Sequence, residues 1–358
     1  MTEIEGVVRD LIEKIKRSSG IDTRFVVLDF SAKKKGTILH IEFKASSDFV
    51  ARAIHQFFEK NKSILGSSII YTVTLLARQI DKAKTFAICN VSVAPLRHAP
   101  SHKSEQVTQF LIGETADILE AKSNKWTRIR LHLDGYVGWV GANQIVQASE
   151  KEYRHWSKEK KVTTLELISS LREEPKRGSV CVREFLAGTY LPTKKKIKNW
   201  LQISLPDGTE GWMPSSSAIR LNGNGENVTS EDIISTAKKF LGISYVWGGR
   251  STKGFDCSGL TQTVFRLHGV ELPRDASLQW TCGKDVGKDT GEFVEGDLVF
   301  FRSRENRISH VGIYLGDEEL IIHSSGFVRI NSLNPSHPLF EERLSSMFVG
   351  ARRLGNIN

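Results

Sequence analysis

An internal repeat constrains the fold of this chain more than any other feature. Between residues 86 and 222 one pattern occurs twice: a strand, an Asp-Gly pair, and a second strand that carries a tryptophan. The matching residues are Trp126, Asp134-Gly135 and Gly138-Trp139 in the first copy, and Trp200, Asp207-Gly208 and Gly211-Trp212 in the second. An Asp-Gly pair supplies the positive φ angles that a tight hairpin turn needs. We therefore predict two small β-barrels, at residues 86–150 and 163–222, with tryptophans in their cores and a charged linker near EKEYRHWSKEKK between them.

Residues 1–85 are predicted to form a separate unit in which a helix, two strands, a helix and a strand follow one another. Apolar residues recur at helical spacing, and Ser46 or Ser47 can cap the second helix. The expected elements are helices over 4–17 and 47–60 and strands over 23–30, 37–43 and 68–79. This αββαβ unit carries no recognisable catalytic motif, and docking or oligomerisation are the roles it suggests. After the barrels, a Gly- and Asn-rich linker at 223–228 leads into a C-terminal domain over 229–358.

The charge balance favours anionic partners only weakly. Lys and Arg number 50 against 41 Asp and Glu, which gives a net charge of +9, but the charges are scattered along the chain. The densest runs, Lys33–Lys35 and Lys194–Lys196, are predicted to lie in solvated turns between strands. Because aromatic residues do not interleave with these runs, we expect no nucleic-acid partner.

The N-terminal segment does not match a secretory signal peptide, because acidic residues occur early and no long apolar run follows. No stretch reaches the roughly 18 apolar residues of a membrane span. A cytoplasmic location with reduced thiols is therefore expected. The four cysteines form no C-x-x-C pair, which argues against a zinc ribbon and against a disulfide framework. We expect no metal ion and no cofactor.

Cys257 stands where a glycine-rich loop meets a helix. The segment YVWGGRSTKGFDCSGL leads into an apolar pattern that continues through Val264 and Leu267 and ends at Gly269. Cys257 is thus predicted in the first helical turn. Helix dipole and unpaired backbone N–H groups stabilise a thiolate there, so we expect a lowered pKa, and the same N–H groups can hold an oxyanion. These are the requirements of an attacking thiol.

Two histidines lie in the segment SHVGIYLGDEELIIHSS, which predicts a β-hairpin. A two-residue turn at Gly316-Asp317 would place His310 directly opposite His323. That arrangement suggests His310 as a general base whose ring is oriented by His323. Zinc ligation by Cys257, the histidines and Asp256 is the weaker interpretation, because these residues are far apart and lack the usual ligand pairing.

The segments DCSG, SHVGIYLG and IIHSS, together with YVWGG, LPRDASLQ and GDLVFF, resemble in kind and order the signature segments of NlpC/p60 peptidases. The resemblance covers residues 229–358. It implies an α+β fold with a papain-like catalytic domain, preceded here by two SH3-like barrels and the αββαβ unit. The family cleaves bonds at D-glutamyl residues of peptidoglycan stem peptides, typically γ-D-glutamyl to a diamino acid.

The resemblance also implies roles for individual residues. Cys257 matches the nucleophile, His310 the general base, His323 the third polar member and Tyr245 a tyrosine near the oxyanion. Asp256 and Ser258 match positions that contact substrate. Further cleft residues implied by the resemblance are Trp247, Arg274, Asp275 and Ser277.

Residues 100–109 in the first barrel resemble a segment of the subgroup of γ-D-glutamyl-L-diamino acid endopeptidases that trims free murein peptides. In that subgroup a carboxylate from this barrel pairs with the peptide's free amino terminus, and Glu105 is the matching position. Tyr136 is expected to line the same subsite. Peptidoglycan-derived peptides with a free amino-terminal residue are the implied substrates.

Two alternatives stay open. The protein could bind cell-wall peptides without catalysis, although a binding module does not need a thiol–imidazole pair. The thioester chemistry could also pass the acyl group to an amine or a lipid instead of water. The diamino acid, the peptide length and the oligomeric state do not follow from the sequence.

Overall fold

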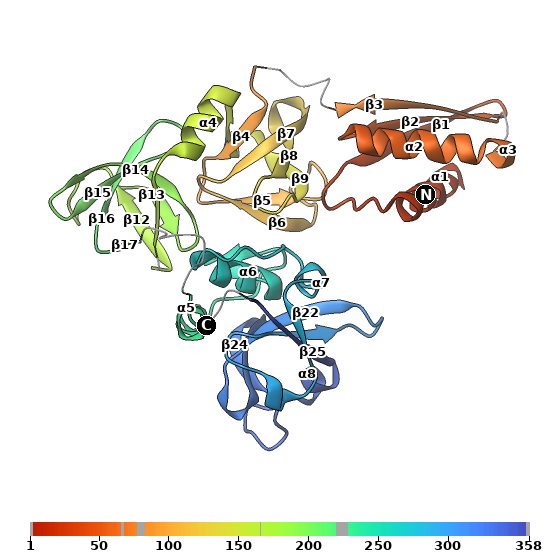
Figure 1. Cartoon of the computed structure of the whole chain (residues 1–358). Helices are drawn as coiled ribbons and strands as arrows, with labels where there is room; N and C mark the ends of the chain where they lie inside the picture. The colour runs from red at the N-terminus through yellow and green to blue at the C-terminus, as the bar shows by residue number, and fades with distance from the viewer. Residues whose placement is uncertain (1–2, 66–67, 77–82, 165, 220–227, 356–358) are drawn as a thin grey trace.

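The computed structural model describes residues 3–65, 68–76, 83–164, 166–219 and 228–355. The fold is α+β, with a small α/β unit, two β-rich units and a C-terminal domain in which helices pack on a sheet (Figure 1). No helix among these residues is both long and apolar enough to cross a bilayer. The predicted linker at 223–228 falls outside the described residues except for Val228. The boundaries of the four predicted domains stay a prediction.

The N-terminal unit has the predicted order of elements, with a short helix added before the last strand. Its elements are α1 (Glu3–Ser19), β1 (Leu28–Lys35), β2 (Ile38–Ala45), α2 (Asp48–Lys60), α3 (Lys62–Leu65) and β3 (Ile69–Leu75). β1 and β2 are antiparallel, and β2 and β3 are parallel. Ser47 caps α2 by accepting from the backbone N–H of Val50, while the Ser46 hydroxyl accepts from Val27 N instead.

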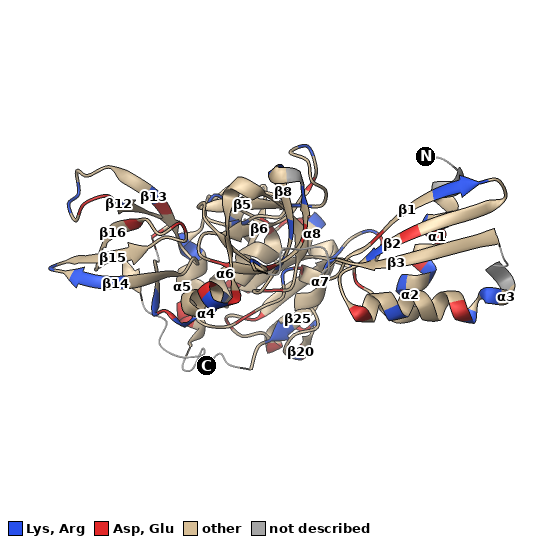
Figure 2. Ribbon diagram, turned by 90° about the horizontal axis from the view of Figure 1, so that it is seen from above, with Lys and Arg blue, Asp and Glu red and all other residues tan. Residues whose placement is uncertain are grey.

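The first strand and the lysine runs differ from the prediction. Residues 23–26 form a turn, so β1 begins at Leu28 and extends through Lys33–Lys35, and the hairpin turns at Gly36 with a φ of 63°. Lys194–Lys196 likewise lie within a strand. Both runs are exposed at strand ends, and Figure 2 shows Lys and Arg spread over all units. The exposure of both lysine runs to solvent was predicted correctly, but the runs lie in strands and not in turns.

Each copy of the repeat forms a sheet of seven strands with the same succession of hairpins. The first contains β4 (Phe86–Cys89), β5 (Val93–Arg97), β6 (Gln106–Leu111), β7 (Thr115–Lys122), β8 (Trp126–Leu131), β9 (Val137–Gly141) and β10 (Ile145–Ala148). The second contains β11 (Lys161–Thr164), β12 (Ile168–Arg172), β13 (Cys181–Leu186), β14 (Leu191–Ile197), β15 (Trp200–Ser204), β16 (Glu210–Pro214) and β17 (Ala218–Ile219). Gly135 and Gly208 adopt positive φ angles in the two predicted turns.

The tryptophans of the repeat divide into two pairs. Trp139 and Trp212 are buried, each beneath a cation, Arg128 and Lys195 respectively. Trp126 and Trp200 are only half-buried. The predicted core position is therefore correct for one tryptophan of each copy.

The charged segment predicted as a linker lies between the two sheets and contains a helix, α4 (Glu150–Lys158). Ser149 and Glu152 form a capping box at its start. Trp156 is buried, and its indole N–H donates to the carbonyl of Gly113 over 2.9 Å. Trp156, together with Tyr153, which stacks on Phe86, thus anchors a mostly polar helix that lies between the two sheets (Figure 1).

Among the described residues the C-terminal domain contains four α-helices and a six-stranded sheet. Its elements are α5 (Ser230–Lys239), β18 (Arg250–Ser251), β19 (Gly254–Phe255), α6 (Cys257–Leu267), α7 (Ala276–Gln279), β20 (Lys284–Gly287), β21 (Leu298–Arg302), β22 (Ile308–Tyr314), β23 (Leu320–Ser325), β24 (Phe327–Ser332), α8 (Glu342–Ser346) and β25 (Phe348–Arg353). The sheet order is β20-β25-β21-β22-β23-β24, so β22 and β23 lie next to each other. Thr229 caps α5. One apolar core joins α5 and α6 to β21, β22 and β23.

Candidate active site

Cys257 is the first residue of α6, as predicted. Asp256 caps the helix, because its carboxylate accepts from Gly259 N over 2.7 Å. The first intrahelical bond runs from Leu260 N to Asp256 O, so the amides of Cys257 and Ser258 precede the helical ladder. A β-carbon at position 259 would lie 2.0 Å from the carbonyl oxygen of Gly249. Glycine at 259 therefore lets the start of α6 pack closely on the glycine loop.

The thiol of Cys257 lies against β22, where it contacts the backbone of the two residues that flank His310. Its sulfur is 3.9 Å from the carbonyl oxygen of Ser309, and the backbone N–H of Val311 also reaches it. Because these two residues flank His310 in sequence, α6 brings the thiol to the backbone of β22 at His310.

His310, His323 and Asn331 form a chain of side-chain hydrogen bonds. Nε2 of His310 is 2.8 Å from Nδ1 of His323, and Nε2 of His323 is 2.9 Å from Oδ1 of Asn331. Asn331 Nδ2 donates to the carbonyl of Leu339, which fixes the orientation of its amide. His323 is completely buried.

These hydrogen bonds determine the tautomers of both histidine rings. The amide oxygen of Asn331 only accepts, so Nε2 of His323 carries a proton and its Nδ1 accepts. Nε2 of His310 therefore donates to His323, and Nδ1 of His310 keeps a lone pair. That lone pair can accept a proton.

The histidines meet through a register that differs from the prediction. His323 pairs with Gly312, and the last pair before the loop is Tyr314 with Ile321, because the connection contains a 3-10 turn over Asp317–Glu319. The shift is two residues, so both rings stay on one face of the sheet. A β-carbon at position 312 would lie 3.1 Å from that of His323. Glycine there leaves room beside His323 for the rings to approach.

Burial governs the ionisation of the pair. It raises the pKa of Cys257 to about 12, with Asp256 acting in the same direction. It lowers the pKa of His310 to about 3, with smaller contributions from His323 and Arg329. The predicted lowering of the Cys257 pKa is therefore wrong, because loss of solvation outweighs the backbone N–H groups around the sulfur. Both groups are therefore neutral at rest, the thiol as well as the imidazole.

Tyr245 lies close to the same thiol. Burial raises the pKa of its phenol to about 12, and Cys257 and Asp256 add to the effect. Its backbone N–H donates to Gly326 O, which ties the loop before the nucleophile helix to the end of β23. The hydroxyl therefore keeps its proton across the neutral range and can donate a hydrogen bond.

Asp256 and Ser258 are both almost fully buried and both contact Arg274. The guanidinium forms an ion pair with the Asp256 carboxylate at 2.5 Å and donates to the Ser258 hydroxyl at 3.1 Å. Its Nε donates to Thr108 of β6 at 2.8 Å. The predicted substrate-contacting pair is thus held by a buried arginine that also links the peptidase domain to the first barrel.

Glu105 and Trp247 meet across the interface between these two units. Trp247 Nε1 donates to Glu105 Oε1 over 2.7 Å, and Gln106 Nε2 donates to the Trp247 carbonyl over 2.8 Å. Trp247 is 62% exposed although it follows Tyr245 by two residues. The structure therefore brings Glu105 to the loop that carries Tyr245.

Tyr136, Asp275 and Ser277 gather around a residue that the sequence did not predict, Arg24. The Tyr136 hydroxyl is 3.5 Å from Asp275 Oδ2, and burial raises the pKa of this phenol. Arg24 of the N-terminal unit contacts both Asp275 and Ser277. The other residue missed is Asn331, for which the polar position in FVRINS was the available signal.

An α+β domain that sets a helix-terminal thiol against the strand that carries the first of two hydrogen-bonded histidines has the architecture of papain-like cysteine peptidases. The model of the NlpC/P60 family matches residues 242–348, and that of the bacterial dipeptidyl-peptidase SH3 domain matches residues 96–145. The chain belongs to the NlpC/P60 family of peptidases, which are hydrolases.

Several known proteins are similar over most of their length. A gamma-D-glutamyl-L-lysine dipeptidyl-peptidase of Bacillus cereus is 30% identical over 258 residues, 69% of this chain and 74% of that protein. A protein of the same name from Bacillus subtilis is 30% identical, over 67% and 79%. The crystal structure of an NlpC/P60 family protein from Bacillus cereus, 26% identical, covers 75% of this chain and 99% of that one with a TM-score of 0.64.

Proposed function

We propose that this protein is a cysteine endopeptidase that hydrolyses the bond between D-glutamate and a diamino acid in peptidoglycan stem peptides. Cys257 at the start of α6, in contact with the backbone on both sides of His310, whose ring begins the hydrogen-bonded chain to Asn331, is the observation that carries the proposal. Two relatives are named gamma-D-glutamyl-L-lysine dipeptidyl-peptidases, and these names support the choice of bond.

The reaction begins with transfer of the thiol proton to Nδ1 of His310 as the sulfur attacks the γ-carbonyl carbon. His310 then protonates the amine of the diamino acid, the C–N bond breaks, and a thioester to Cys257 forms. A water molecule gives a proton to His310 and attacks the thioester, the C–S bond breaks, and the proton returns to the thiol. His323 and Asn331 hold the His310 ring and stabilise its transient charge.

The negative oxygen that forms during attack needs donors that are already in place. The backbone N–H of Cys257 precedes the ladder of α6, and the neighbouring Tyr245 hydroxyl keeps its proton. We assign the oxyanion site to these two groups. Gly259 N is excluded because Asp256 already occupies it.

Preference for a free amino-terminal residue is proposed to depend on Glu105. Its carboxylate is exposed at the interface and bonds to Trp247, close in sequence to Tyr245. A carboxylate there can pair with the amine of a released peptide such as L-Ala-γ-D-Glu-diamino acid. A stem peptide still joined to the glycan lacks that amine, so the protein would act on released peptides, in recycling or remodelling of the wall.

Mass spectrometry of the products tests the function. The purified protein is incubated with L-Ala-γ-D-Glu-meso-diaminopimelate and with the N-acetylated peptide, beside Cys257→Ala. We expect cleavage after D-Glu in the first peptide only, and none with the variant. Tight binding of the peptide without cleavage by the wild-type protein would instead support the non-catalytic binding protein.

A further inference from the structure

Arg24, in the turn after α1, reaches the peptidase domain. Its Nη1 is 2.7 Å from Asp275 Oδ2 and 3.4 Å from Ser277 Oγ, at the start of α7. We propose that the N-terminal unit completes the substrate cleft through Arg24, a positioning residue that sets the amino-terminal subsite of the peptide. The inference rests on the proposed function and extends it to a unit that the two family models do not match.

Arg24 is held both at its guanidinium group and at its backbone carbonyl. Asp22 binds Nε through both carboxylate oxygens at 3.0 Å and Nη2 at 2.5 Å. The Arg24 carbonyl accepts from Val137 N in the first barrel over 2.7 Å. Phe25 packs edge-on against the Tyr136 ring, with centroids 5.9 Å apart. The guanidinium is thus directed at Asp275 before any substrate arrives.

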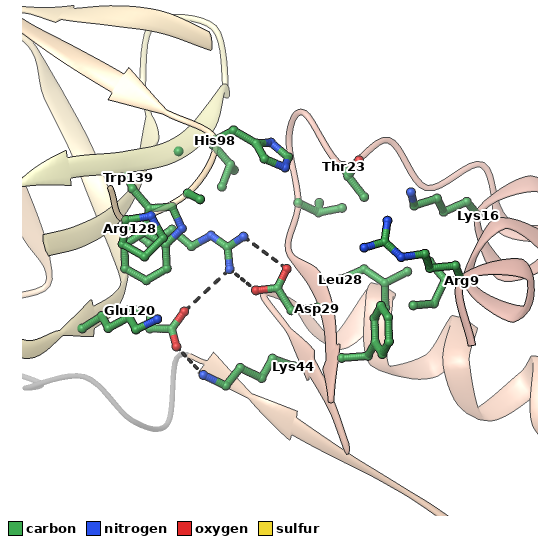
Figure 3. A pocket seen from close by; sticks show the side chains of 18 of the residues that line it. Arg9, Lys16, Thr23, Leu28, Asp29, Lys44, His98, Glu120, Arg128 and Trp139 are labelled. Atoms are coloured by element: carbon green, nitrogen blue, oxygen red, sulfur yellow. Dashed lines mark hydrogen bonds and ion pairs between the residues drawn. The ribbon is translucent and has the colours of Figure 1, made fainter. Parts of the chain in front are cut away.

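The N-terminal unit itself is anchored on the first barrel. Arg128 of β8 forms ion pairs with Asp29 of β1 and with Glu120, and Glu120 also pairs with Lys44 of β2 (Figure 3). These side chains line a cavity of about 1090 Å³ between the two units. Beside it, an apolar cluster joins Val27, Leu76, Leu119 and Val137. Contacts on two sides therefore fix where the turn with Arg24 stands.

Asp275 is oriented by these contacts and not by its helix. It occupies the N-cap position of α7, yet its side chain makes no capping bond. One oxygen, Oδ2, receives both the Arg24 guanidinium and the Tyr136 hydroxyl. The preceding residue, Arg274, binds Asp256 at the start of the nucleophile helix. Asp275 is therefore linked to the thiol through its neighbour Arg274 and through Asp256, which Arg274 binds and which directly precedes Cys257.

The charges around Arg24 and Asp275 suit a cationic group. Asp22 and Asp275 together carry two negative charges, and Arg24 neutralises one of them. The remaining negative charge can attract the same ammonium group that we assign to Glu105, the free amino terminus of the peptide. Without Arg24 the two carboxylates would repel each other, and Asp275 would lose the contact that orients it beside Tyr136.

The test measures kcat and KM of the full-length chain with L-Ala-γ-D-Glu-meso-diaminopimelate. Arg24→Ala is expected to raise KM about tenfold, the effect of one lost charge-assisted contact, and to leave kcat within about twofold. Arg24→Lys should restore part of the affinity, because an ammonium group reaches one carboxylate but cannot bridge two. Arg154→Ala, which removes an exposed arginine of α4, is the matched control and should leave KM unchanged.

A double-mutant cycle separates positioning from docking. If Arg24 acts through Asp275, the effects of Arg24→Ala and Asp275→Asn on KM will not multiply in the double variant. Should Arg24→Ala fail to fold, Arg24→Lys and Asp275→Asn give the same readout. An unchanged KM in Arg24→Ala, or effects that multiply fully, would overturn the inference alone. No cleavage by the wild-type protein would contradict the proposed function and the inference with it.

Discussion

His310 and His323 are joined by a 2.8 Å hydrogen bond although they do not stand opposite each other in the sheet. The backbone partner of His323 is Gly312, two residues beyond His310. The rings meet at right angles, with centroids 5.0 Å apart, because the shift preserves the face on which they lie and glycine leaves the space between them open. Chemistry that needs two imidazoles in contact is thus built on a diagonal pair.

Asn331 is expected to matter through the orientation of His323. Replacing it with leucine removes the acceptor for Nε2 of His323 and leaves that ring free to adopt the other tautomer. We predict a fall in kcat of about tenfold with little change in KM, measured by initial rates, since one neutral hydrogen bond contributes about 1 kcal/mol. Asn331→Asp restores an acceptor and should recover most of the rate. Equal losses in both variants would contradict this role.

The ionisation of Cys257 predicts slow alkylation at neutral pH. With a pKa of about 12, the thiol carries almost no thiolate at pH 7, and its reactivity should rise steadily above pH 9. Cys181, an exposed free cysteine, provides an internal reference that should react with iodoacetamide faster. Site-resolved mass spectrometry gives both rates. Faster labelling of Cys257 than of Cys181 at pH 6 would instead indicate a thiolate–imidazolium pair.

His310 should retain its role as base well into the acid range. A histidine whose pKa is lowered to about 3 is neutral at every pH above that value, so its protonation does not remove the base between pH 8 and 5. We predict that kcat/KM for the free enzyme stays within about threefold over that range. A loss of activity with a midpoint near pH 6.5, the ordinary value for histidine, would show that the ring is more solvated than the structure has it.

Glu105 is expected to control selectivity for the free amine. Glu105→Gln keeps the shape and the hydrogen bond to Trp247 but removes the charge. We predict that the ratio of kcat/KM for the free and the N-acetylated peptide falls at least about tenfold. Gln106→Ala, at the neighbouring position, removes a hydrogen bond to Trp247 without changing charge and serves as the control. An unchanged ratio in Glu105→Gln would refute the role of the carboxylate.

The buried ion pair between Arg274 and Asp256 is predicted to be important for stability. Arg274→Met leaves the Asp256 carboxylate buried beside Ser258 without its cation, which costs about 3–5 kcal/mol. Denaturant unfolding, followed through the transition of the peptidase domain, should show this loss. Arg154→Met on exposed α4 should shift the same transition by less than about 0.5 kcal/mol.

Local patterns predicted most of the peptidase domain. The glycine loop and the apolar period placed Cys257 at the start of α6, and alternation along the two strands placed His310 and His323 on one face. The length of the connection at Asp317–Glu319 could not be predicted, because its glutamates at 318 and 319 adopt positive φ angles that residues of this type rarely adopt. The pairing register was therefore wrong while the contact was correct.

Properties that depend on packing between distant segments were not predictable from the sequence. The pKa of Cys257 depends on how completely β22 covers the thiol. The contact of Arg24 with Asp275 joins residues 251 positions apart, and no periodicity in either segment indicates it. The domain boundaries, the cytoplasmic location and the functional roles of the site residues stay predictions.

The most direct test of the central claim is to trap the acyl-enzyme. The wild-type protein is mixed with L-Ala-γ-D-Glu-meso-diaminopimelate, quenched in acid during turnover, digested and mapped by mass spectrometry. We predict an L-Ala-D-Glu acyl group on Cys257 in the wild-type protein, and neither adduct nor product with Cys257→Ala. Product formation by the Cys257→Ala variant, or an acyl group on a different residue, would contradict the assignment of Cys257 as the nucleophile.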